Sequence, residues 1–430
     1  MKIAVIGAGI SGLTAALRLQ RRHEVVVLEA ADYVGGHTHT HDVEIDGRRT
    51  AVDSGFIVFN HRTYPNFKAL LGELGVACQP TDMSFSVRCD RTGLEYAGTG
   101  LNGLFAQRRN LVSPRFWRLI GDWLRFNRQA QQLLPELDEQ TTVGEFFAQY
   151  SYSAAFRQSY FLPLGSAVWS SPRETFERFP IRFVLEFYRN HGMLDLPGRL
   201  PWRVIQGGSK QYVEAILRRL RGGMRLSSPV RSIRRLDGPV EVHVAGQSPE
   251  RFDHVVMACH SDQALRAIGE SATPIERELL SAFPYQRNTA VLHTDELVMP
   301  RCRRAWASWN YHLPHDDNGN ATVTYDMTRL QSLPLSPRFF VTLNADDRID
   351  PRRVLRRMVY HHPVFTAGRA AARRRHHELI DHRGISYCGA YWGHGFHEDG
   401  VNSALAVATA LDASSPRPKQ EHLVLQEAAS

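Results

Sequence analysis

Cysteine is scarce in this 430-residue sequence, and its pattern excludes two common uses of the residue. The five cysteines are odd in number and scattered, and no C-x-x-C pair occurs. They therefore predict neither a disulfide framework nor a structural zinc site. Free cysteines of this kind fit a reducing compartment, so we expect a cytoplasmic protein.

The sequence also lacks long hydrophobic runs, lysine and nucleic-acid-binding motifs. No apolar run approaches the roughly 20 residues that a membrane-spanning helix needs. Lysine accounts for only four of the 52 basic residues, so arginine carries nearly all of the net charge of +8. Without a recognised motif, this charge does not predict a nucleic-acid partner. Genomic composition is the simpler explanation for the arginine. The alternative is attraction to an anionic substrate or to a membrane, with peripheral contact at its inner face.

The N-terminus contains the pattern of a nucleotide-binding βαβ unit. Residues 2–6 are an apolar run of strand length, and residues 24–29 are a second run that ends in a carboxylate. A glycine-rich turn between them leads into an amphipathic helix over residues 13–22. The order of strand, G-x-G-x-x-G, helix, strand and acid is typical of a dinucleotide site.

Each part of this unit has a physical role. Gly7 permits the tight turn out of the strand, and Gly9 lets the backbone approach a pyrophosphate because it has no Cβ. Gly12 lets the helix pack close to the strand. The free N–H groups of the helix N-terminus then face the phosphates. Glu29 lies where a carboxylate accepts hydrogen bonds from ribose hydroxyls.

A second glycine pair narrows the choice of nucleotide. Glu29 is followed by five residues and then by Gly35-Gly36. This segment resembles the E-x(5)-G-G extension of two-dinucleotide-binding-domain flavoproteins, which bind FAD. The resemblance implies that the pair passes close to the FAD diphosphate. Most members of that family have Arg or Lys next, whereas this chain has His37.

His37, His39 and His41 occupy alternate positions, so on a strand they would share one face and could hold a metal. The nearest carboxylates, Asp42 and Glu44, would point to the opposite face. We therefore predict a polar edge near the cofactor and no metal site.

Aromatic side chains are frequent between residues 101 and 190 and recur at helical spacing. They predict the core of a helical domain, of which a few rings face an apolar substrate pocket. Strands of an antiparallel sheet that covers the cofactor are predicted over residues 289–293, 305–311, 321–325 and 339–343. We also expect a basic helix over residues 352–360 and a solvated basic run at residues 373–377.

Three further segments resemble parts of the same flavoproteins. Residues 53–55 match an Asp/Glu-x-Gly element that runs beside the flavin, and residues 252–258 match a D-x-V-V-x-A strand that closes the FAD domain. Val230 matches a position whose backbone contacts adenine. Residues 385–404 resemble the C-terminal flavin motif of amine-oxidase-like and phytoene-desaturase-like enzymes. There a helix N-terminus faces the flavin and stabilises negative charge on its reduced form.

At 430 residues the chain is long enough for two domains with substantial cores. The resemblance implies an α/β fold, with a Rossmann-like two-dinucleotide-binding FAD domain and an inserted α+β substrate domain of helices and antiparallel sheet. The predicted parts are a discontinuous FAD-binding domain of residues 1–70, 195–270 and 380–415, a substrate domain of residues 71–194 and 271–379, and a flexible tail of residues 416–430.

Residues 1–411 are similar to one bacterial group of predicted FAD-dependent oxidoreductases, often encoded beside cyclopropane-fatty-acid-synthase-like methyltransferases. The stretches that carry the likeness are residues 35–40, 53–60, 106–110, 305–311 and 388–400. The resemblance implies a dehydrogenase or desaturase that passes hydride from an apolar, lipid-like fatty acyl substrate to flavin N5, with a lipid methyltransferase as a partner. The alternatives are an amine or amino-acid oxidase and a non-catalytic flavoprotein partner of such a methyltransferase.

One departure from the amine oxidases bears on these alternatives. Those enzymes often hold a lysine by water to the flavin N5, on a strand of the covering sheet. All four lysines of this chain lie elsewhere, and the corresponding strand covers residues 289–293. Amine oxidation with that arrangement is therefore disfavoured. His293 is either a substitute for the lysine or a core histidine.

The candidate general bases are His397, His394 and Tyr391, and the candidate pocket walls are Trp306, Trp309, Tyr311 and Tyr325. The candidate cofactor-binding residues are Gly7, Gly9, Ile10, Ser11, Gly12, Glu29, Ala30, Gly35, Gly36, His37, Thr38, Gly55, Phe56, Val230, Ala258, Gly389, Glu398, Asp399, Gly400, Val401 and Ala404.

Overall fold

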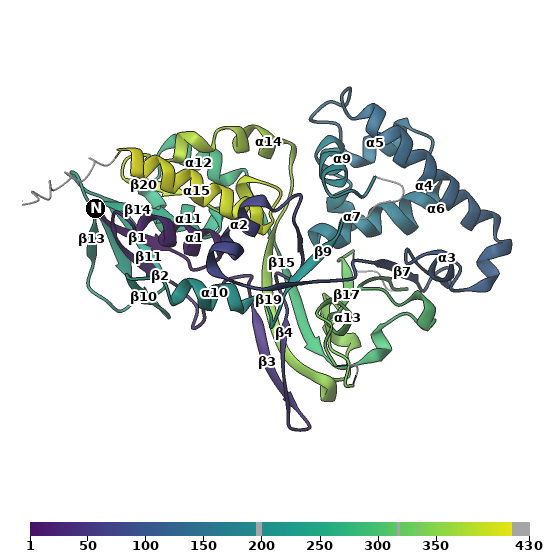
Figure 1. Cartoon of the computed structure of the whole chain (residues 1–430). Coiled ribbons are helices and arrows are strands. Elements are labelled where there is room, and N and C mark those ends of the chain that lie inside the picture. Colours follow the sequence, from purple (N-terminus) through teal and green to yellow (C-terminus); the bar gives the residue numbers. More distant parts are fainter. Residues whose placement is uncertain (195–199, 316–318, 335, 415–430) are drawn as a thin grey trace, which may run out of the picture.

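The molecule consists of two parts built on large β-sheets and a separate group of helices (Figure 1). The computed structural model describes residues 1–194, 200–315, 319–334 and 336–414. The predicted tail of residues 416–430 lies outside these ranges. Figure 1 shows the parallel sheet and its helices on the left, and the group of helices at the upper right. None of the described helices combines the length and the apolar character needed to cross a bilayer.

A five-stranded parallel sheet forms the nucleotide-binding part, in the order β10-β2-β1-β14-β20. In that order its strands are Gly223–Arg225, Glu24–Leu28, Lys2–Ile6, His254–Met257 and Ile385–Tyr387. Ile3 and Val5 face one side of the sheet and Ala4 and Ile6 the other, and all four are buried. Helices therefore cover both faces, which is the rule for parallel sheets. The predicted Rossmann-like α/β fold is confirmed.

The two faces of this sheet have different partners. One face carries α1 (Ile10–Leu19), α2 (Pro65–Leu74), α10 (Lys210–Leu217) and α15 (His397–Ser414). The other carries α11 (Ser261–Ile268), α12 (Pro274–Ser281), α14 (Ala367–Arg374) and a three-stranded sheet of β11 (Val230–Arg235), β12 (Val240–Val244) and β13 (Glu250–Phe252).

A seven-stranded sheet forms the second part, in the order β19-β15-β18-β17-β16-β7-β8. In that order its strands are Val354–Pro363, Tyr285–His293, Phe340–Leu343, Thr322–Asp326, Trp309–Leu313, Phe85–Cys89 and Leu94–Ala97. All neighbours are antiparallel except β16 and β7. The four predicted strands are present, although β16 begins later than expected because residues 303–305 form a 3-10 turn.

The predicted basic helix over residues 352–360 is wrong, because this segment forms β19 along the edge strand position next to β15. Met358 and Tyr360 are buried. Val359, which lies between them, and Arg357, which precedes Met358, are exposed. That alternation has the period of a strand. Arg356 and Arg357 are adjacent and so point to opposite faces of the sheet, but both are exposed on this edge strand, where charge discourages further pairing.

The predicted solvated run at residues 373–377 is only partly solvated. Arg373 and His376 are half-buried. His376 Nε2 lies 2.7 Å from the Tyr387 carbonyl oxygen, and its ring stacks on Trp392 at 4.3 Å. The run therefore covers the strand that leads to the C-terminal motif.

The group of helices is an aromatic-rich unit that packs on the seven-stranded sheet. Its helices are α3 (Leu101–Leu104), α4 (Pro114–Leu133), α5 (Val143–Gln149), α6 (Ala154–Phe156), α7 (Leu162–Trp169), α8 (Arg173–Phe176) and α9 (Ile181–Asn190). Local chemistry fixes where they begin. The Ser113 side chain accepts from the N–H of Phe116 at the start of α4, and Thr142 and Glu145 form a capping box on α5.

The remaining elements are short connections. The hairpin of β3 (Thr40–Ile45) and β4 (Arg48–Asp53) projects at the bottom of Figure 1. Its two turn residues, Asp46 and Gly47, both have positive φ. A small sheet joins β5 (Phe59–Asn60), β9 (Trp202–Ile205) and β6 (Cys78–Pro80), and α13 covers Met327–Leu330. One π-helical turn covers Arg157–Phe161, and 3-10 turns cover Arg108–Val112, Gly269–Ser271, Glu296–Val298, Arg303–Ala305, Asp346–Arg348, Pro351–Arg353, His376–Leu379 and Ala390–Trp392.

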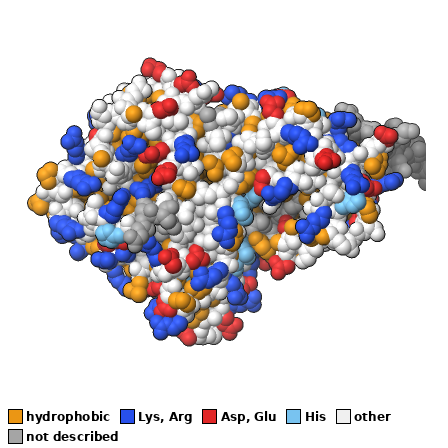
Figure 2. Space-filling model, turned by 180° about the vertical axis from the view of Figure 1, so that it is seen from behind, with side chains coloured by type: hydrophobic (Ala, Val, Ile, Leu, Met, Phe, Trp, Pro, Cys, Tyr) orange, Lys and Arg blue, Asp and Glu red, His pale blue; other side chains and the backbone are white. Residues whose placement is uncertain are grey.

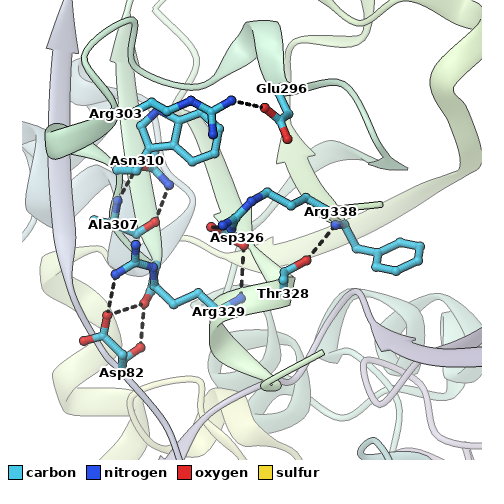
Figure 3. A network of polar contacts seen from close by, with 12 residues as sticks. Asp82, Glu296, Arg303, Ala307, Asn310, Asp326, Thr328, Arg329 and Arg338 are labelled. Carbon is cyan, nitrogen blue, oxygen red and sulfur yellow. Dashed lines mark hydrogen bonds and ion pairs between the residues drawn. The ribbon is translucent and has the colours of Figure 1, made fainter. Parts of the chain in front are cut away.

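A polar network fixes one end of the seven-stranded sheet (Figure 3). The buried Asp326 carboxylate accepts from the Arg329 backbone N–H at 3.0 Å and pairs with Arg338 at 3.3 Å. Arg329 in turn pairs with Asp82 at 3.1 Å. Burial raises the pKa of Asp326. The network ties the segment that enters β7 to α13 and so fixes Ser84, which lines the cavity described below.

Candidate functional site

One cavity of about 1300 Å³ runs from the turn after β1, past the seven-stranded sheet, into the helical unit. Ligand pockets commonly measure about 300–1,000 Å³. The cavity is therefore large enough for a dinucleotide together with a substrate.

The nucleotide end of the cavity is built from the two glycine turns. Gly7 (φ 104°), Gly35 (φ 127°) and Gly36 (φ 58°) adopt positive φ, which favours glycine. A Cβ on Gly36 would lie 3.2 Å from the Gly9 Cα, so the two turns are in contact. A Cβ on Gly9 would meet nothing within 4 Å and would project into the cavity that Gly9 lines. This open glycine surface fits a pyrophosphate.

Backbone hydrogen bonds hold the Glu29 carboxylate at the same end of the cavity as the glycine turns. Its carboxylate accepts from the backbone N–H groups of Ala8 at 2.7 Å and of Ala31 at 2.8 Å, and it lines the cavity. Val230 and Ala258 line the same end, and sequence reasoning missed their neighbours Arg231 and Cys259.

The predicted residues divide into cavity-lining and supporting positions. Those that line the cavity are Gly7, Gly9, Ile10, Ser11, Glu29, Ala30, Gly35, Gly36, His37, Gly55, Phe56, Val230, Ala258, Gly389, Tyr391, His394 and His397. Those that lie behind its wall are Gly12, Thr38, Glu398, Asp399, Gly400, Val401 and Ala404. The cofactor-binding and catalytic roles of both sets stay predictions.

The supporting positions have clear structural partners. A Cβ on Gly12 would lie 1.9 Å from the Gly7 carbonyl oxygen, and one on Gly400 would lie 2.9 Å from Ser11 Oγ. Both glycines therefore allow close packing around α1. The Glu398 carboxylate accepts from the N–H groups of Asn66 at 3.0 Å and Phe67 at 2.8 Å, so it caps the start of α2 instead of facing the cavity.

His397 is a candidate general base whose ring is held in place by its neighbours. Its Nε2 lies 2.9 Å from Thr38 Oγ1 and 3.2 Å from the Tyr212 hydroxyl, and its ring stacks on Phe56 at 3.5 Å. Burial lowers the pKa of His397 well below its usual value. Its imidazole is therefore neutral, with Nε2 engaged by two hydroxyls.

Further histidines approach the same region from β19 and from the end of β14. The His37 ring lies 5.2 Å from Tyr360, 5.6 Å from His362 and 5.8 Å from His260. Burial lowers the pKa of His37 to about 4 and the pKa values of His260 and His362 to about 3. Sequence reasoning missed Tyr360 because it assigned residues 352–360 to a helix, and it made no prediction for His362.

His39 and His41, which with His37 suggested a metal site, are engaged in hydrogen bonds. His39 Nδ1 lies 3.2 Å from the Tyr360 hydroxyl, and His41 Nε2 lies 2.8 Å from Ser54 Oγ. Within the described parts of the chain, no group of three or more His, Cys, Asp or Glu side chains is arranged to hold a metal ion.

The other two candidate bases differ in their chemistry. Burial raises the pKa of Tyr391 well above its usual value, which makes the phenol a poor base. His394 Nε2 is buried and has no hydrogen-bond partner among the described residues. Its ring stacks on Phe183 at 4.9 Å, and burial lowers its pKa to about 3. His394 is therefore a neutral imidazole on the cavity wall with a free ring nitrogen.

Arg369 fixes the loop that carries these two residues. This buried guanidinium donates to the carbonyl oxygens of Tyr391 at 2.7 Å and Gly393 at 2.9 Å, and lies 3.5 Å over the Phe365 ring. Burial lowers the pKa of Arg369 to about 9. Sequence reasoning missed this residue, because its partners are backbone atoms of another loop.

An apolar arm of the cavity enters the helical unit. We define the apolar arm by its lining residues Leu101, Leu104, Leu119, Ile120, Trp123, Leu164, Val168, Trp169, Phe187 and Met193. Among all described residues that line the cavity, Glu29 at the nucleotide end is the only acidic one. The arm therefore suits an uncharged, apolar ligand.

Two of the four predicted pocket walls are correct. Trp309 and Tyr325 line the cavity, whereas Trp306 packs on Phe340 and Tyr311 is buried beneath α7. His293 does not line the cavity either, because its Nε2 lies 2.8 Å from Thr342 Oγ1 inside the sheet. It is a core histidine and no substitute for a lysine near the flavin.

Comparison with known proteins identifies the family. Residues 10–294 match the family of flavin-containing amine oxidoreductases. The chain is 27% identical over 289 residues to the flavin-dependent L-tryptophan oxidase RebO of Lentzea aerocolonigenes, which covers 59% of this chain and 57% of that protein. It is 24% identical over 292 residues to a flavin-containing amine oxidase of Oncorhynchus mykiss, which covers 66% of this chain and 54% of that protein. The chain thus matches little more than half the length of these curated relatives.

A solved structure supports the fold. The CLA-producing fatty acid isomerase from P. acnes aligns with a TM-score of 0.67 and 17% identity, over 95% of this chain and 98% of that one. The glycine turns, Glu29 and the continuous cavity fit the cofactor of this family. The chain belongs to the flavin-containing amine oxidoreductase family, and membership implies FAD as its cofactor.

Proposed function

We propose that the protein is a dehydrogenase or desaturase of a fatty acyl chain. The observation that carries this proposal is the apolar arm, which leads from the flavin end of the cavity into the helical unit and is lined by aliphatic and aromatic side chains. A straight hydrocarbon chain gains from burial in such a space about 0.8 kcal/mol for each CH₂ group. The pocket offers a long apolar ligand much contact and few polar partners.

The residues of the chain would orient the substrate, exclude water and accept a proton. When bound, FAD accepts a hydride at N5 of its ring system. The second hydrogen of the oxidised carbon–carbon bond leaves as a proton. His394 Nε2 would accept it, because this ring nitrogen of the cavity wall has no hydrogen-bond partner among the described residues. The low pKa of His394 makes it a weak base, so the transfer needs close contact between the ring and the substrate.

The absence of charge in the apolar arm argues against small amines and amino acids. No acidic side chain is available there among the described residues to pair with an ammonium group, and the two arginines that line the cavity, Arg231 and Arg266, belong to β11 and α11 beside the nucleotide end. An amino-acid carboxylate would thus enter the arm without a cation.

Oxidation of an apolar amine is the second candidate, because the curated relatives are an L-tryptophan oxidase and an amine oxidase. A neutral amine could enter the arm, since a neutral nitrogen needs no counter-charge. This candidate predicts hydrogen peroxide release with hydrophobic amines. A third candidate is a flavoprotein without a reaction of its own that acts as the partner of a lipid methyltransferase in the cytoplasm. It predicts co-purification with that enzyme and no reduction of the flavin by any lipid.

The proposal is tested by the fatty acids of cells that contain the protein. Cells that express the wild type are compared with cells that express Gly9→Val, which should fold without FAD. We expect new or lost unsaturated acyl chains in phospholipids from wild-type cells only. Identical acyl profiles, with flavin-loaded wild type recovered from the same cells, would refute the fatty acyl substrate.

A further inference from the structure

Large apolar side chains stand exposed in one short stretch between α3 and the first turns of α4. The exposed fractions are 76% for Leu101, 48% for Leu111, 83% for Val112 and 48% for Trp117. Five of the ten large hydrophobic residues that are exposed in the described parts of the chain lie between residues 101 and 124. The stretch is held in place, because the Trp117 indole N–H donates to the Leu111 carbonyl oxygen at 2.8 Å.

The same stretch is positively charged. Residues 96–121 contain no Asp or Glu and four arginines, Arg108, Arg109, Arg115 and Arg118. All four are exposed, and no ion pair joins any of them to a described residue. Figure 2 shows mostly basic and hydrophobic side chains at its left end, which is the end of the molecule that contains α3 and α4. The surface thus combines apolar side chains with uncompensated positive charge.

This surface lies at the mouth of the apolar arm. Leu101 and Leu104 of α3 and Leu119 and Ile120 of α4 all line the cavity. Leu101 is also the second most exposed apolar side chain of the stretch. A chain that enters between α3 and α4 therefore passes directly from the exposed patch into the arm.

We propose that this surface, residues 101–118, docks the protein on an anionic lipid bilayer and that the substrate enters the cavity from that bilayer. Exposed aliphatic and indole side chains insert at the boundary between head groups and acyl chains, while arginines remain at the level of the phosphates. The entry of an acyl chain rests on the proposed function, whereas the docking rests on the surface alone.

The polarity of the cavity favours a chain that is still attached to a lipid. A free fatty acid would bring a carboxylate into an arm that has no arginine or lysine among its described lining residues. An esterified chain has no such charge, and its phosphate head group would meet the arginines outside the mouth. The substrate class is therefore the acyl chain of an intact membrane phospholipid.

Vesicle flotation of the FAD-loaded protein tests the docking without any need for turnover. We expect the wild type to float with vesicles of phosphatidylcholine and phosphatidylglycerol, to stay unbound with phosphatidylcholine alone, and to bind less as salt is raised. Since each arginine near the surface adds about fivefold to binding, Arg115→Glu combined with Arg118→Glu should lower the partition coefficient by about 25-fold or more.

A matched pair of substitutions separates insertion from a general effect of charge. Val112→Asp should lower binding by about tenfold or more, because it removes an inserting side chain. Leu297→Asp should not change it, since Leu297 is 82% exposed but lies outside the stretch, in the turn Glu296–Val298. Both sites are exposed, so both variants should fold and hold FAD.

Three results would overturn the docking proposal. They are no flotation of the wild type with anionic vesicles, equal flotation of Val112→Asp and Leu297→Asp, and self-association through the patch in place of flotation. The two proposals fail separately. Flotation without reduction of the flavin by any lipid would support the docking and refute the acyl substrate. Reduction of the flavin by lipid without flotation would support the acyl substrate and refute the docking.

Discussion

His397 Nε2 lies 2.9 Å from Thr38 Oγ1, so the first residue of α15 is hydrogen-bonded to the segment that follows the second glycine turn. Thr38 also contacts the Tyr212 hydroxyl at 2.5 Å, and Tyr212 belongs to α10. These contacts hold the His397 ring against Phe56, where both residues line the cavity. The second glycine turn and the N-terminus of α15 are thus joined by buried hydrogen bonds.

Removal of the Thr38 hydroxyl should weaken the hydrogen bonding between Thr38, His397 and Tyr212. Thr38→Val leaves His397 and Tyr212 bonded only to one another at 3.2 Å, so we expect a loss of about 1–2 kcal/mol in the free energy of unfolding. Thr38→Ser keeps the hydroxyl and should lose less. Chemical unfolding of the two flavin-loaded variants measures the difference. Equal free energies of unfolding would show that the hydroxyl does not stabilise the contact between these segments.

The two glycines of the first turn should respond differently to valine. Gly9 has φ −75° and ψ −176°, which valine adopts readily, and open space beyond its Cβ position. Gly9→Val should fold with an ordinary melting temperature but purify without flavin colour. Gly12→Val should fail to fold, because its Cβ would lie 1.9 Å from the Gly7 carbonyl oxygen. A yellow Gly9→Val protein would contradict the placement of the diphosphate.

Buried neutral histidines should make the fold sensitive to acid. Burial lowers the pKa of His293 to about 4, whereas the unfolded chain has the ordinary value of about 6.5. Below pH 6.5 the unfolded state therefore binds a proton at this imidazole, whereas the folded state binds one only below about pH 4. The free energy of unfolding falls as the pH drops through this window. Between pH 7 and pH 5 the titration of this residue lowers the free energy of unfolding by about 2 kcal/mol.

His293→Gln should remove that share of the pH dependence. An amide can replace both hydrogen bonds, to Thr342 Oγ1 and from the Asp295 N–H. We expect the variant to lose about 2 kcal/mol less than the wild type between pH 7 and pH 5 in urea unfolding. Parallel losses in the two proteins would mean that His293 already titrates normally in the folded state.

The width of the apolar arm should set which chains react. Val168 of α7 lines the arm, so Val168→Trp should fill it and lower kcat/KM for long acyl chains by about tenfold or more. Short chains should be affected less, and flavin content should not change. Val168→Ala, which widens the same position, is the matched control. An equal loss for short and long chains would place the substrate elsewhere.

Local chemistry made the nucleotide end predictable. The glycines of both turns and Glu29 act through backbone conformation and close approach, which depend on neighbours in sequence. The same holds for Gly12 and Gly400, although these glycines turned out to permit packing around α1 and do not line the cavity. Sequence pattern shows that a Cβ is not tolerated at such a position without showing what lies beside it.

Contacts between distant segments made the rest of the cavity wall harder to predict. Tyr360 and His362 reach the cavity only because β19 pairs with β15, and the arginines beside them obscured the strand period. Trp306 and Trp309 are three residues apart, yet only Trp309 lines the cavity, because β16 begins there and Trp306 precedes it. Where a strand begins depends on its neighbours in the sheet, which the sequence alone does not specify.

Anaerobic reduction of the bound flavin tests the central claim most directly. The FAD-loaded protein is mixed, without oxygen, with phospholipid vesicles in one arm and with a panel of hydrophobic amines and amino acids in the other. The account predicts loss of the yellow absorbance with the vesicles and no change with the panel. Bleaching by an amine or amino acid, with none by any lipid, would contradict it.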